Sequence, residues 1–174
     1  DAIVWAAGGS VSGVPANANP AEVINLSLGS GGACGRTFQN AIDAAVGRGT
    51  TVVVAAGNDN IDASGSSPAN CNNVITVGAS DTAGKRSIWS SVQQSNYGAV
   101  VDLAAPGSSI LSTINSGTRG PVAESYASYD GTSMAAPHVA GVVALVQSVS
   151  NPIMTPAQVE ALLKNTVTPF PATP

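Results

Sequence analysis

Histidine and basic residues are scarce in this chain, and their scarcity excludes several kinds of protein. The 174 residues include one histidine and 6 Lys+Arg, against 10 Asp+Glu, which gives a net charge of −4 at pH 7. So few cations cannot form the basic face that neutralises a phosphate backbone, which argues against nucleic-acid binding. Charged residues make up 9% of the chain and hydrophobic residues 44%, a balance typical of a folded core rather than a disordered chain.

Long apolar runs are also missing from the sequence. The longest, residues 139–146, is interrupted by Gly141 and is far shorter than the roughly 20 residues that a helix needs to cross a bilayer. We therefore expect no membrane-spanning segment. The chain begins at Asp1 without a basic and apolar leader, for which a processed product is the simplest interpretation.

Motifs for metal binding are missing as well. Neither His-Glu-x-x-His nor Cys-x-x-Cys occurs, and Asp59, Asn60 and Asp62 do not have the spacing of an EF-hand loop. We interpret these three residues as a solvated loop and expect no catalytic metal. The two cysteines, Cys34 and Cys71, fit either a disulfide or two buried thiols, since a single pair favours neither.

The chain does contain alternating strand and helix patterns, which predict an α/β fold. Strands are expected at residues 23–28, 50–56, 74–77 and 100–103. A first helix is expected to begin before residue 1 and to end at Gly8 and Gly9. Further helices are expected at 37–46 with Thr37 as its cap, at about 133–149, and from the capping box that starts at Thr155. The continuous β-branched run of residues 50–56 indicates a parallel strand covered on both faces. We expect the tail after Thr168 to be irregular.

The segment with the most chemical information is residues 131–141, Gly-Thr-Ser-Met-Ala-Ala-Pro-His-Val-Ala-Gly. It places Ser133 where a loop enters a helix of small residues. Unpaired amides and the positive end of the helix dipole favour negative charge at that position, as a tetrahedral oxyanion intermediate requires. A bare Gly-Thr-Ser would instead be interpreted as an ordinary helix N-cap.

These eleven residues resemble the nucleophile motif of the subtilisin family of serine proteases, and two upstream segments extend the resemblance. Residues 25–29, Asn-Leu-Ser-Leu-Gly, are similar to the family's substrate-binding strand, and residues 55–58, Ala-Ala-Gly-Asn, to its oxyanion segment. The resemblance implies one three-layer α/β domain over residues 1–174, with a parallel β-sheet between helices, which this chain contains incompletely.

The resemblance also implies roles for individual residues. Ser133 would attack the substrate carbonyl, and the Asn58 amide would stabilise the oxyanion together with the Ser133 N–H. Taken alone, Asn58 would be a turn residue. A peptide substrate would add as a strand along Leu28 and Gly29. The implied substrate-binding residues are Ser27, Leu28, Gly29, Ala55, Ala56 and Gly57, with Ser66 or a near neighbour in the pocket wall.

Two further implications concern groups that would stabilise the fold, a disulfide and a metal ion. In a secreted protease a disulfide between Cys34 and Cys71 is favoured over free thiols, because disulfides persist in oxidising surroundings. The resemblance also allows a structural calcium ion near Ala69, Cys71 and Asp102. No cofactor is expected to take part in catalysis.

The histidine and aspartate of a serine-protease triad are not found in this chain. The family's Asp-Ser/Thr-Gly and His-Gly-Thr motifs do not occur. The one histidine, His138, is five residues beyond Ser133 on the same helix, and at about 100° per residue it points roughly 140° away. We interpret it as a structural residue packed inside, with its ring nitrogens hydrogen-bonded.

We therefore predict a secreted, extracellular serine endopeptidase that cleaves polypeptides through an acyl-enzyme. The catalytic Asp and His are expected from a complementary amino-terminal fragment, whose loss would leave an unpaired sheet edge and an uncovered apolar face. The alternative is a catalytically inactive subtilisin-like module that binds peptides. An ester hydrolase on another fold is disfavoured, because Gly131-Thr132-Ser133 is not part of a Gly-x-Ser-x-Gly elbow.

Overall fold

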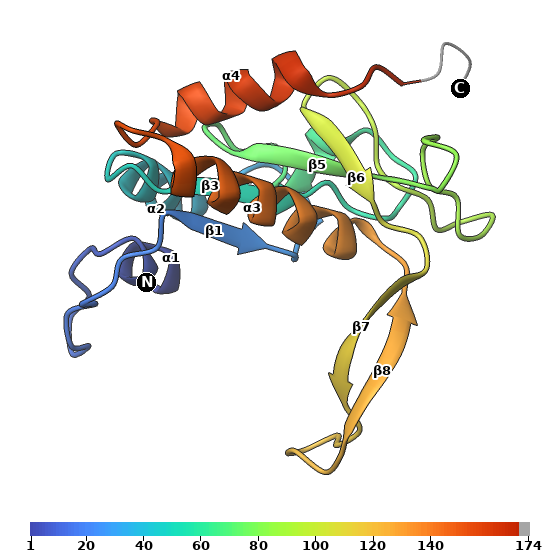
Figure 1. Ribbon diagram of the computed structural model, residues 1–174, viewed down its shortest axis with the longest axis horizontal. Helices are drawn as coiled ribbons and strands as arrows, with labels where there is room; N and C mark the ends of the chain where they lie inside the picture. Colours follow the sequence, from blue (N-terminus) through green and yellow to red (C-terminus); the bar gives the residue numbers. More distant parts are fainter. Residues whose placement is uncertain (171–174) are drawn as a thin grey trace.

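The structure, a computed structural model, describes residues 1–170 and is built around one parallel β-sheet (Figure 1). The helices are α1 (Ala2–Ala6), α2 (Arg36–Val46), α3 (Thr132–Val149) and α4 (Pro156–Thr166), with a short 3-10 helix, η1 (Ala63–Gly65). The strands are β1 (Val23–Leu26), β2 (Ser30–Gly31), β3 (Thr51–Ala55), β4 (Ser66–Ser67), β5 (Ile75–Ser80), β6 (Leu103–Pro106), β7 (Ile110–Asn115) and β8 (Glu124–Tyr129).

The main sheet has the strand order β1-β3-β5-β6, and all neighbouring strands in it run parallel. Val23 lies opposite Thr51 at one end of the sheet, and Val77 lies opposite Leu103 at the other. All residues of β3 are buried, as expected for a continuous β-branched run covered on both faces. In such sheets the loops that follow the strands gather at the carboxyl edge, where ligand sites are usual.

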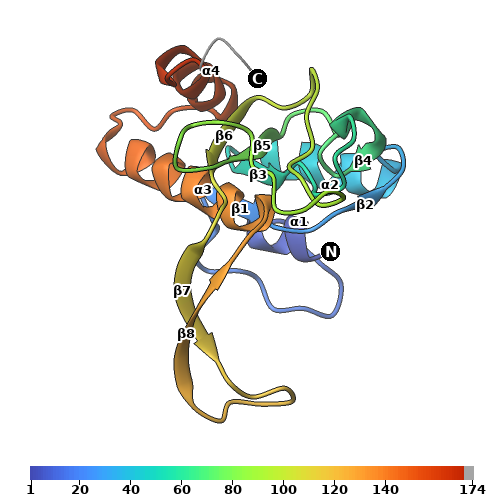
Figure 2. The ribbon, with the colours of Figure 1, turned by 90° about the vertical axis from the view of Figure 1, so that its right-hand side faces the viewer.

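Helices cover both faces of this sheet and make three layers (Figures 1 and 2). Because successive side chains of a strand point to opposite faces, Val53 packs toward α3 and α4, whereas Val52 and Val54 pack toward α2. Each fully buried valine contributes roughly 1.5–3 kcal/mol relative to an exposed one. The cluster under α3 and α4 also contains Val77, Leu103, Ala136, Val143, Val159 and Leu163. The predicted three-layer α/β fold is confirmed.

Helix α3 lies across β1, β3, β5 and β6. Among the described residues it is the one helix long and apolar enough to cross a membrane, judged by length and composition alone. Its buried side chains, among them Ala135, Ala136, Val139 and Val143, pack on the sheet. Packing on the sheet therefore accounts for the apolar side chains on this face of the helix.

Several predicted boundaries are wrong, among them the end of β5, which runs to Ser80 rather than to residue 77, and one pair of strands was not predicted. Helix α2 is capped by Gly35, whose backbone is extended (φ −68°, ψ 144°), whereas Thr37 already lies inside the helix. Strand β6 begins at Leu103 rather than at residue 100.

The antiparallel hairpin of β7 and β8, which was not predicted, projects away from the sheet (Figures 1 and 2). Both of its faces are largely exposed, so its sequence lacks the alternation that marks a half-buried strand.

The predicted start of α4 is confirmed in detail. The Thr155 hydroxyl accepts a hydrogen bond from Gln158 N, and the Gln158 side chain accepts one from Thr155 N, which together form a capping box. Residues 169–170 of the predicted irregular tail have no regular structure, and the rest of that tail lies outside the described residues.

Candidate active site

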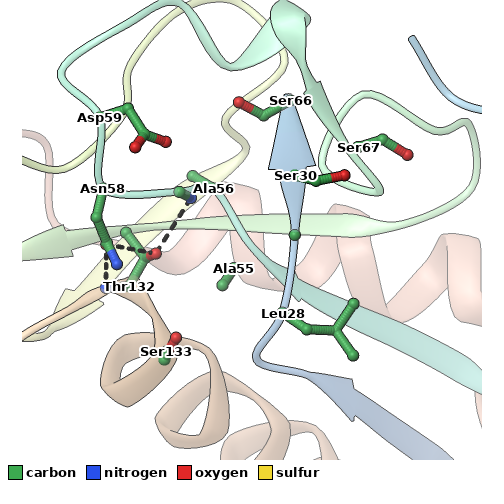
Figure 3. Close-up of a pocket in the computed structure, with 12 residues that line it drawn as sticks. Leu28, Ser30, Ala55, Ala56, Asn58, Asp59, Ser66, Ser67, Thr132 and Ser133 are labelled. Atoms are coloured by element: carbon green, nitrogen blue, oxygen red, sulfur yellow. Dashed lines mark hydrogen bonds between the residues drawn. The ribbon is translucent and has the colours of Figure 1, made fainter. Parts of the chain in front are cut away.

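Ser133 and Asn58, 75 residues apart in sequence, line one pocket at the carboxyl edge of the sheet (Figure 3). The pocket has a volume of about 260 Å³. It forms where the loop after β3 meets the first turn of α3. The other lining residues are Leu28, Gly29, Ser30, Ala55, Ala56, Gly57, Asp59, Ser66, Ser67 and Thr132. Apart from Ser27, the residues predicted for catalysis and substrate binding thus surround the same space.

Asn58 is held with its amide nitrogen free. Its Oδ1 accepts one hydrogen bond from Thr132 N and one from Thr132 Oγ1, each 2.9 Å long. A main-chain N–H can only donate, so the atom that faces it must be the amide oxygen. No hydrogen bond within residues 1–170 uses Asn58 Nδ2. This half-buried amide therefore has both N–H donors available at the pocket.

Thr132 connects the nucleophile helix to the loop after β3. It is fully buried, and its hydroxyl donates to Asn58 Oδ1 while accepting a hydrogen bond of 3.1 Å from Gly57 N. The sequence motif alone assigns no role to Thr132. The signal that could have indicated a role was its position: Thr132 is the first residue of α3 and directly precedes the candidate nucleophile.

Ser133 stands at the amino terminus of α3, where main-chain N–H groups have no helical partner. No hydrogen bond within the described residues uses the Ser133 N–H, and Ser133 lines the same pocket as Asn58. The Ser133 hydroxyl makes one contact, a long hydrogen bond of 3.4 Å to the carbonyl of Ser27. Two free donors beside a weakly bonded hydroxyl form an arrangement that can stabilise an oxyanion.

Ser27 contacts the first turn of α3 and does not line the pocket. Its hydroxyl donates to the carbonyl oxygen of Ser133 at 2.8 Å and accepts from Asn25 Nδ2 at 2.9 Å. The Ser133 carbonyl lacks its usual helical partner, since residue 137 is a proline and has no N–H. Ser27 supplies the missing donor and thereby joins the predicted substrate strand to the first turn of α3.

Small residues and a short strand pair form the rest of the pocket. Ser30 pairs with Ser67 and Gly31 with Ser66, antiparallel, which links β2 to β4. A Cβ at Gly29 would lie 3.1 Å from the carbonyl oxygen of Ser67, so glycine permits the close approach of the two segments.

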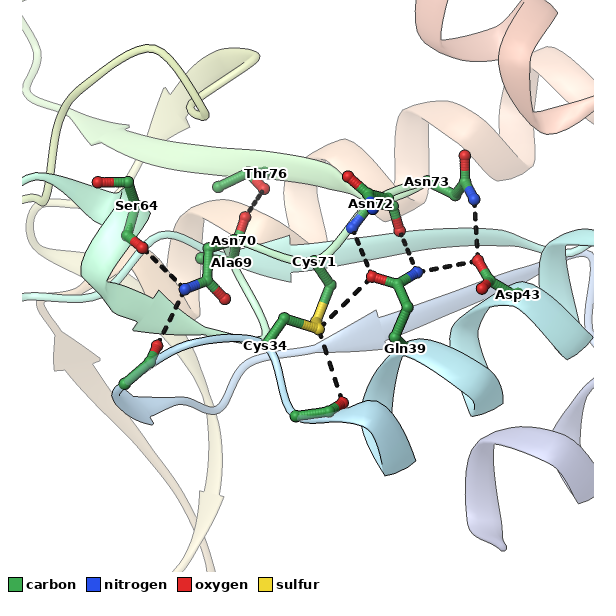
Figure 4. Close-up of a disulfide and its surroundings, with 12 residues drawn as sticks. Cys34, Gln39, Asp43, Ser64, Ala69, Asn70, Cys71, Asn72, Asn73 and Thr76 are labelled. Carbon is green, nitrogen blue, oxygen red and sulfur yellow. Dashed lines mark hydrogen bonds between the residues drawn. A yellow bond between two sulfur atoms is a disulfide. The ribbon is translucent and has the colours of Figure 1, made fainter.

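The Cys34–Cys71 disulfide that the sequence analysis favoured is present, with the two Cα atoms 5.1 Å apart (Figure 4). It joins the segments that follow β2 and β4, and so it fixes the two strands behind the pocket wall. Gln39 of α2 accepts a hydrogen bond from Asn72 N at 2.9 Å and donates to Asn72 O. The chain just beyond Cys71 is therefore held against α2 by hydrogen bonds as well.

The prediction that His138 is packed inside is wrong for this chain. Its side chain is exposed, although one ring nitrogen, Nδ1, is 2.8 Å from the carbonyl oxygen of Met134. Residue 138 lies on the part of α3 that does not face the sheet, as the helical spacing requires. Within the described residues no histidine or carboxylate hydrogen-bonds to Ser133, although a serine that acts as a nucleophile needs a general base.

The residues suggested for a calcium site are engaged in other bonds. Asp102 accepts a hydrogen bond from Thr76 N at 2.8 Å and forms an ion pair of 2.7 Å with Lys164. The Ala69 carbonyl accepts from the Thr76 hydroxyl. The Asp102 carboxylate is thus paired with an ammonium group in this structure. Among residues 1–170 no three His, Cys, Asp or Glu side chains are grouped for metal binding. Structural calcium stays a prediction.

Two groups outside the pocket have shifted pKa values. Hydrogen bonding to Asp102 raises the pKa of Lys164. Burial opposes this shift, whereas the charge of Asp102 and the hydrogen bond and charge of Glu160 add to it. Hydrogen bonds from the main chain and side chain of Ser64 lower the pKa of Asp62, which caps η1. Neither group lines the pocket.

Comparison with known proteins gives the chain clear relatives. The family model described as "Subtilase family" matches residues 1–173. An "Extracellular protease" of Xanthomonas campestris pv. campestris is 66% identical over 171 residues, which cover 98% of this chain and 29% of that protein. An "Extracellular basic protease" of Dichelobacter nodosus is 51% identical over 98% of this chain and 28% of its own length.

Solved structures agree with these matches. A protease structure from Pseudoalteromonas arctica superimposes with a TM-score of 0.92 at 50% identity, over 98% of this chain and 51% of that one. A cold-adapted subtilisin-like serine proteinase gives a TM-score of 0.68 at 39% identity and covers 82% of this chain. The chain thus spans about half of a solved relative and less than a third of the curated ones.

Proposed function

This chain belongs to the subtilase family, and on that premise we propose that it supplies the nucleophile and the oxyanion hole of a secreted serine endopeptidase. The observation that carries the proposal is the shared pocket, in which Ser133 stands beside two free donors, Asn58 Nδ2 and its own N–H. Serine proteases require this combination, because the substrate carbonyl oxygen gains negative charge as the hydroxyl attacks.

In the proposed reaction the Ser133 hydroxyl passes its proton to a histidine while Oγ attacks the carbonyl carbon of the peptide bond. The oxyanion accepts hydrogen bonds from Asn58 and Ser133 N–H. The tetrahedral intermediate then collapses, the C–N bond breaks, and the histidine returns the proton to the leaving amine. Water hydrolyses the resulting ester by the same steps, which releases the carboxylic acid and restores the hydroxyl.

We place the histidine and its orienting aspartate in a segment outside this chain. Two features of residues 1–170 support a missing neighbour. The outer edge of β1 has no strand beside it, and α3 exposes Val142, Leu145 and Val149, which are 45%, 69% and 84% exposed and lie on one helical face. An exposed apolar stripe and an open sheet edge are both surfaces that soluble proteins normally cover.

The substrate is proposed to be an extended polypeptide. The main-chain groups of Leu28 and Gly29 form no hydrogen bonds within the described residues, so they can pair with a peptide as an added strand. The names of the relatives, an extracellular protease and an extracellular basic protease, support a secreted enzyme.

The experiment is serine-directed labelling of the full-length gene product. We expect a fluorophosphonate reagent to add one label, mapped by mass spectrometry to Ser133, and the protein to cleave casein. Ser133→Ala should abolish both. Ser148→Ala, which changes an exposed serine on the same helix, is the matched control and should label and cleave normally. A folded protein with Ser133 unlabelled would contradict the proposal and favour a peptide-binding module without activity.

A further inference from the structure

Asn96 lies in the connection between β5 and β6, and its side chain is only 2% exposed. All four hydrogen-bonding positions of its amide are used. Nδ2 donates to the Ala56 carbonyl at 2.9 Å and to Ser66 Oγ at 3.1 Å. Oδ1 accepts from Asp59 N at 2.9 Å and from Ile61 N at 3.2 Å. An asparagine can form no more bonds than these, so the amide has one defined orientation.

The main chain around Asn96 holds the same segment. Asn96 N donates to the Gly57 carbonyl at 2.9 Å, and Gln94 N donates to the Asn58 carbonyl at 3.1 Å. The residues on both sides of Asn58 are therefore bonded to the segment of residues 94–96, whereas the Asn58 side chain is left to bond Thr132. Asn96 itself is anchored on β5, because Ser95 Oγ accepts from Ala79 N and donates to Asn96 O.

Gly57 makes this arrangement sterically possible. Its φ is +103°, a conformation that side-chain-bearing residues rarely adopt, and a Cβ at this position would lie 2.4 Å from Asn96 Nδ2. The absence of a side chain at Gly57 thus lets the Asn96 amide reach Ala56 and Ser66 behind it. Ser66 also lines the pocket, so one buried amide joins the loop that carries Asn58 to the pocket wall.

From these contacts we propose that Asn96 is the positioning residue of the oxyanion hole, which fixes the backbone of residues 56–61 so that Asn58 Nδ2 points at the substrate oxygen. This inference rests on the proposed function. Asn96 does not touch the substrate; it acts through Asn58. Displacing a catalytic group by about 1 Å can lower the rate about 100-fold, so a residue that sets its place has a kinetic effect beyond stability.

The test is a double-mutant cycle in the full-length enzyme, with kcat and KM measured on a peptide p-nitroanilide. Losing one oxyanion donor lowers kcat about 10²–10³-fold, a magnitude known from subtilisin itself, and we expect this for Asn58→Ala. Asn96→Ala should lower kcat about 10- to 100-fold with KM changed less than about threefold. Once Asn58 is alanine, adding Asn96→Ala should lower kcat less than about threefold, since residues that act as a unit are not additive.

Gln147→Ala is the matched control. Gln147 is also a buried amide, and it bonds the main chain of Met154 far from the pocket. It should lower the melting temperature as Asn96→Ala does, while kcat stays at the wild-type value.

Asn96→Asp provides a second variant, with a side chain of the same size as asparagine, if Asn96→Ala does not fold. It keeps the acceptor for Asp59 N and Ile61 N but loses both donors, and it should likewise lose kcat only where Asn58 is present.

Two results would overturn the inference while leaving the protease assignment intact. One is a wild-type kcat in a less stable Asn96 variant. The other is a loss of equal size with and without Asn58. Failure of the proposed function gives a different result, because the wild-type protein would then bind no fluorophosphonate at all.

Discussion

The side-chain oxygen of Asn58 accepts two hydrogen bonds from Thr132, one from its N–H and one from its hydroxyl, both 2.9 Å long. The residue next to Thr132 is Ser133, so the proposed oxyanion donor is bonded directly to the first turn of the helix that carries the proposed nucleophile. The amide cannot rotate without breaking both bonds. This relationship makes the contribution of Thr132 measurable.

Thr132→Val removes the hydroxyl but keeps the shape of the side chain. Asn58 loses one of its two bonds, and the N–H of Gly57 loses its acceptor. We expect the free energy of unfolding to fall by about 1–3 kcal/mol, the cost of leaving a partly buried polar group unsatisfied, and kcat to fall about tenfold because the Asn58 amide is less firmly oriented.

Peptide hydrolysis measures the kinetic effect, and urea unfolding in a Ser133→Ala background measures stability without self-digestion. Thr132→Ser retains the hydroxyl and serves as the control, with kcat close to the wild-type value. A valine variant as active as the serine variant would show that the N–H bond alone orients Asn58.

Gly57→Ala tests whether the loop after β3, which carries Asn58, needs glycine for its backbone angle or for space. Alanine at φ +103° is strained, and its Cβ would also lie 2.4 Å from Asn96 Nδ2. The control is Gly13→Ala, because φ is +76° at Gly13 and an added Cβ would meet no neighbouring atom within 4 Å. We expect Gly13→Ala to cost about 1–2 kcal/mol of unfolding free energy from the backbone angle alone, and Gly57→Ala to cost more and to lower kcat. Equal costs at the two positions, measured by urea unfolding, would contradict a role for space.

The ion pair between Lys164 and Asp102 predicts a defined pH dependence of stability. Hydrogen bonding to Asp102 raises the pKa of Lys164 in the folded protein above its ordinary value of 10.5. The stabilisation is therefore fully present below pH 10.5 and is lost as the pH rises through the folded-state pKa.

Since the Lys164 side chain is 44% exposed, solvent screening keeps the effect at or below about 1 kcal/mol. Urea unfolding of the Ser133→Ala protein with and without Lys164→Met should show this difference at pH 8, and the difference should shrink above pH 10.5. A difference that stays constant into this alkaline range would assign the effect to packing of the lysine stem instead.

Much of the fold could be predicted because its signals are local. The β-branched residues of β3 are buried on both faces, and the Thr155 capping box begins α4 where the sequence indicates. The hairpin of β7 and β8 was missed because neither of its faces is buried, so the sequence carries no period-two alternation there. The cap of α2 is Gly35, two residues before the cap predicted at Thr37, a shift common at helix ends.

The site could be predicted only in its outline. The motifs around Ser133 and Asn58 identify residues that line one pocket, but not the bonds that orient them. Thr132 and Asn96 act across 74 and 40 residues of sequence, respectively, and no spacing rule connects positions so far apart. The environment of His138 depends on whether another segment covers α3, so burial could not be inferred from its place on the helix.

The short pairing of β2 with β4 has a consequence for the entropy of binding a peptide. Residues 28–29 lead directly into β2, and Ser66 and Ser67 of β4 line the pocket. The pairing of the two strands and the Cys34–Cys71 disulfide already order both segments. A polypeptide that pairs with Leu28 and Gly29 would therefore lose its own conformational freedom on binding, while the surface that receives it is ordered beforehand.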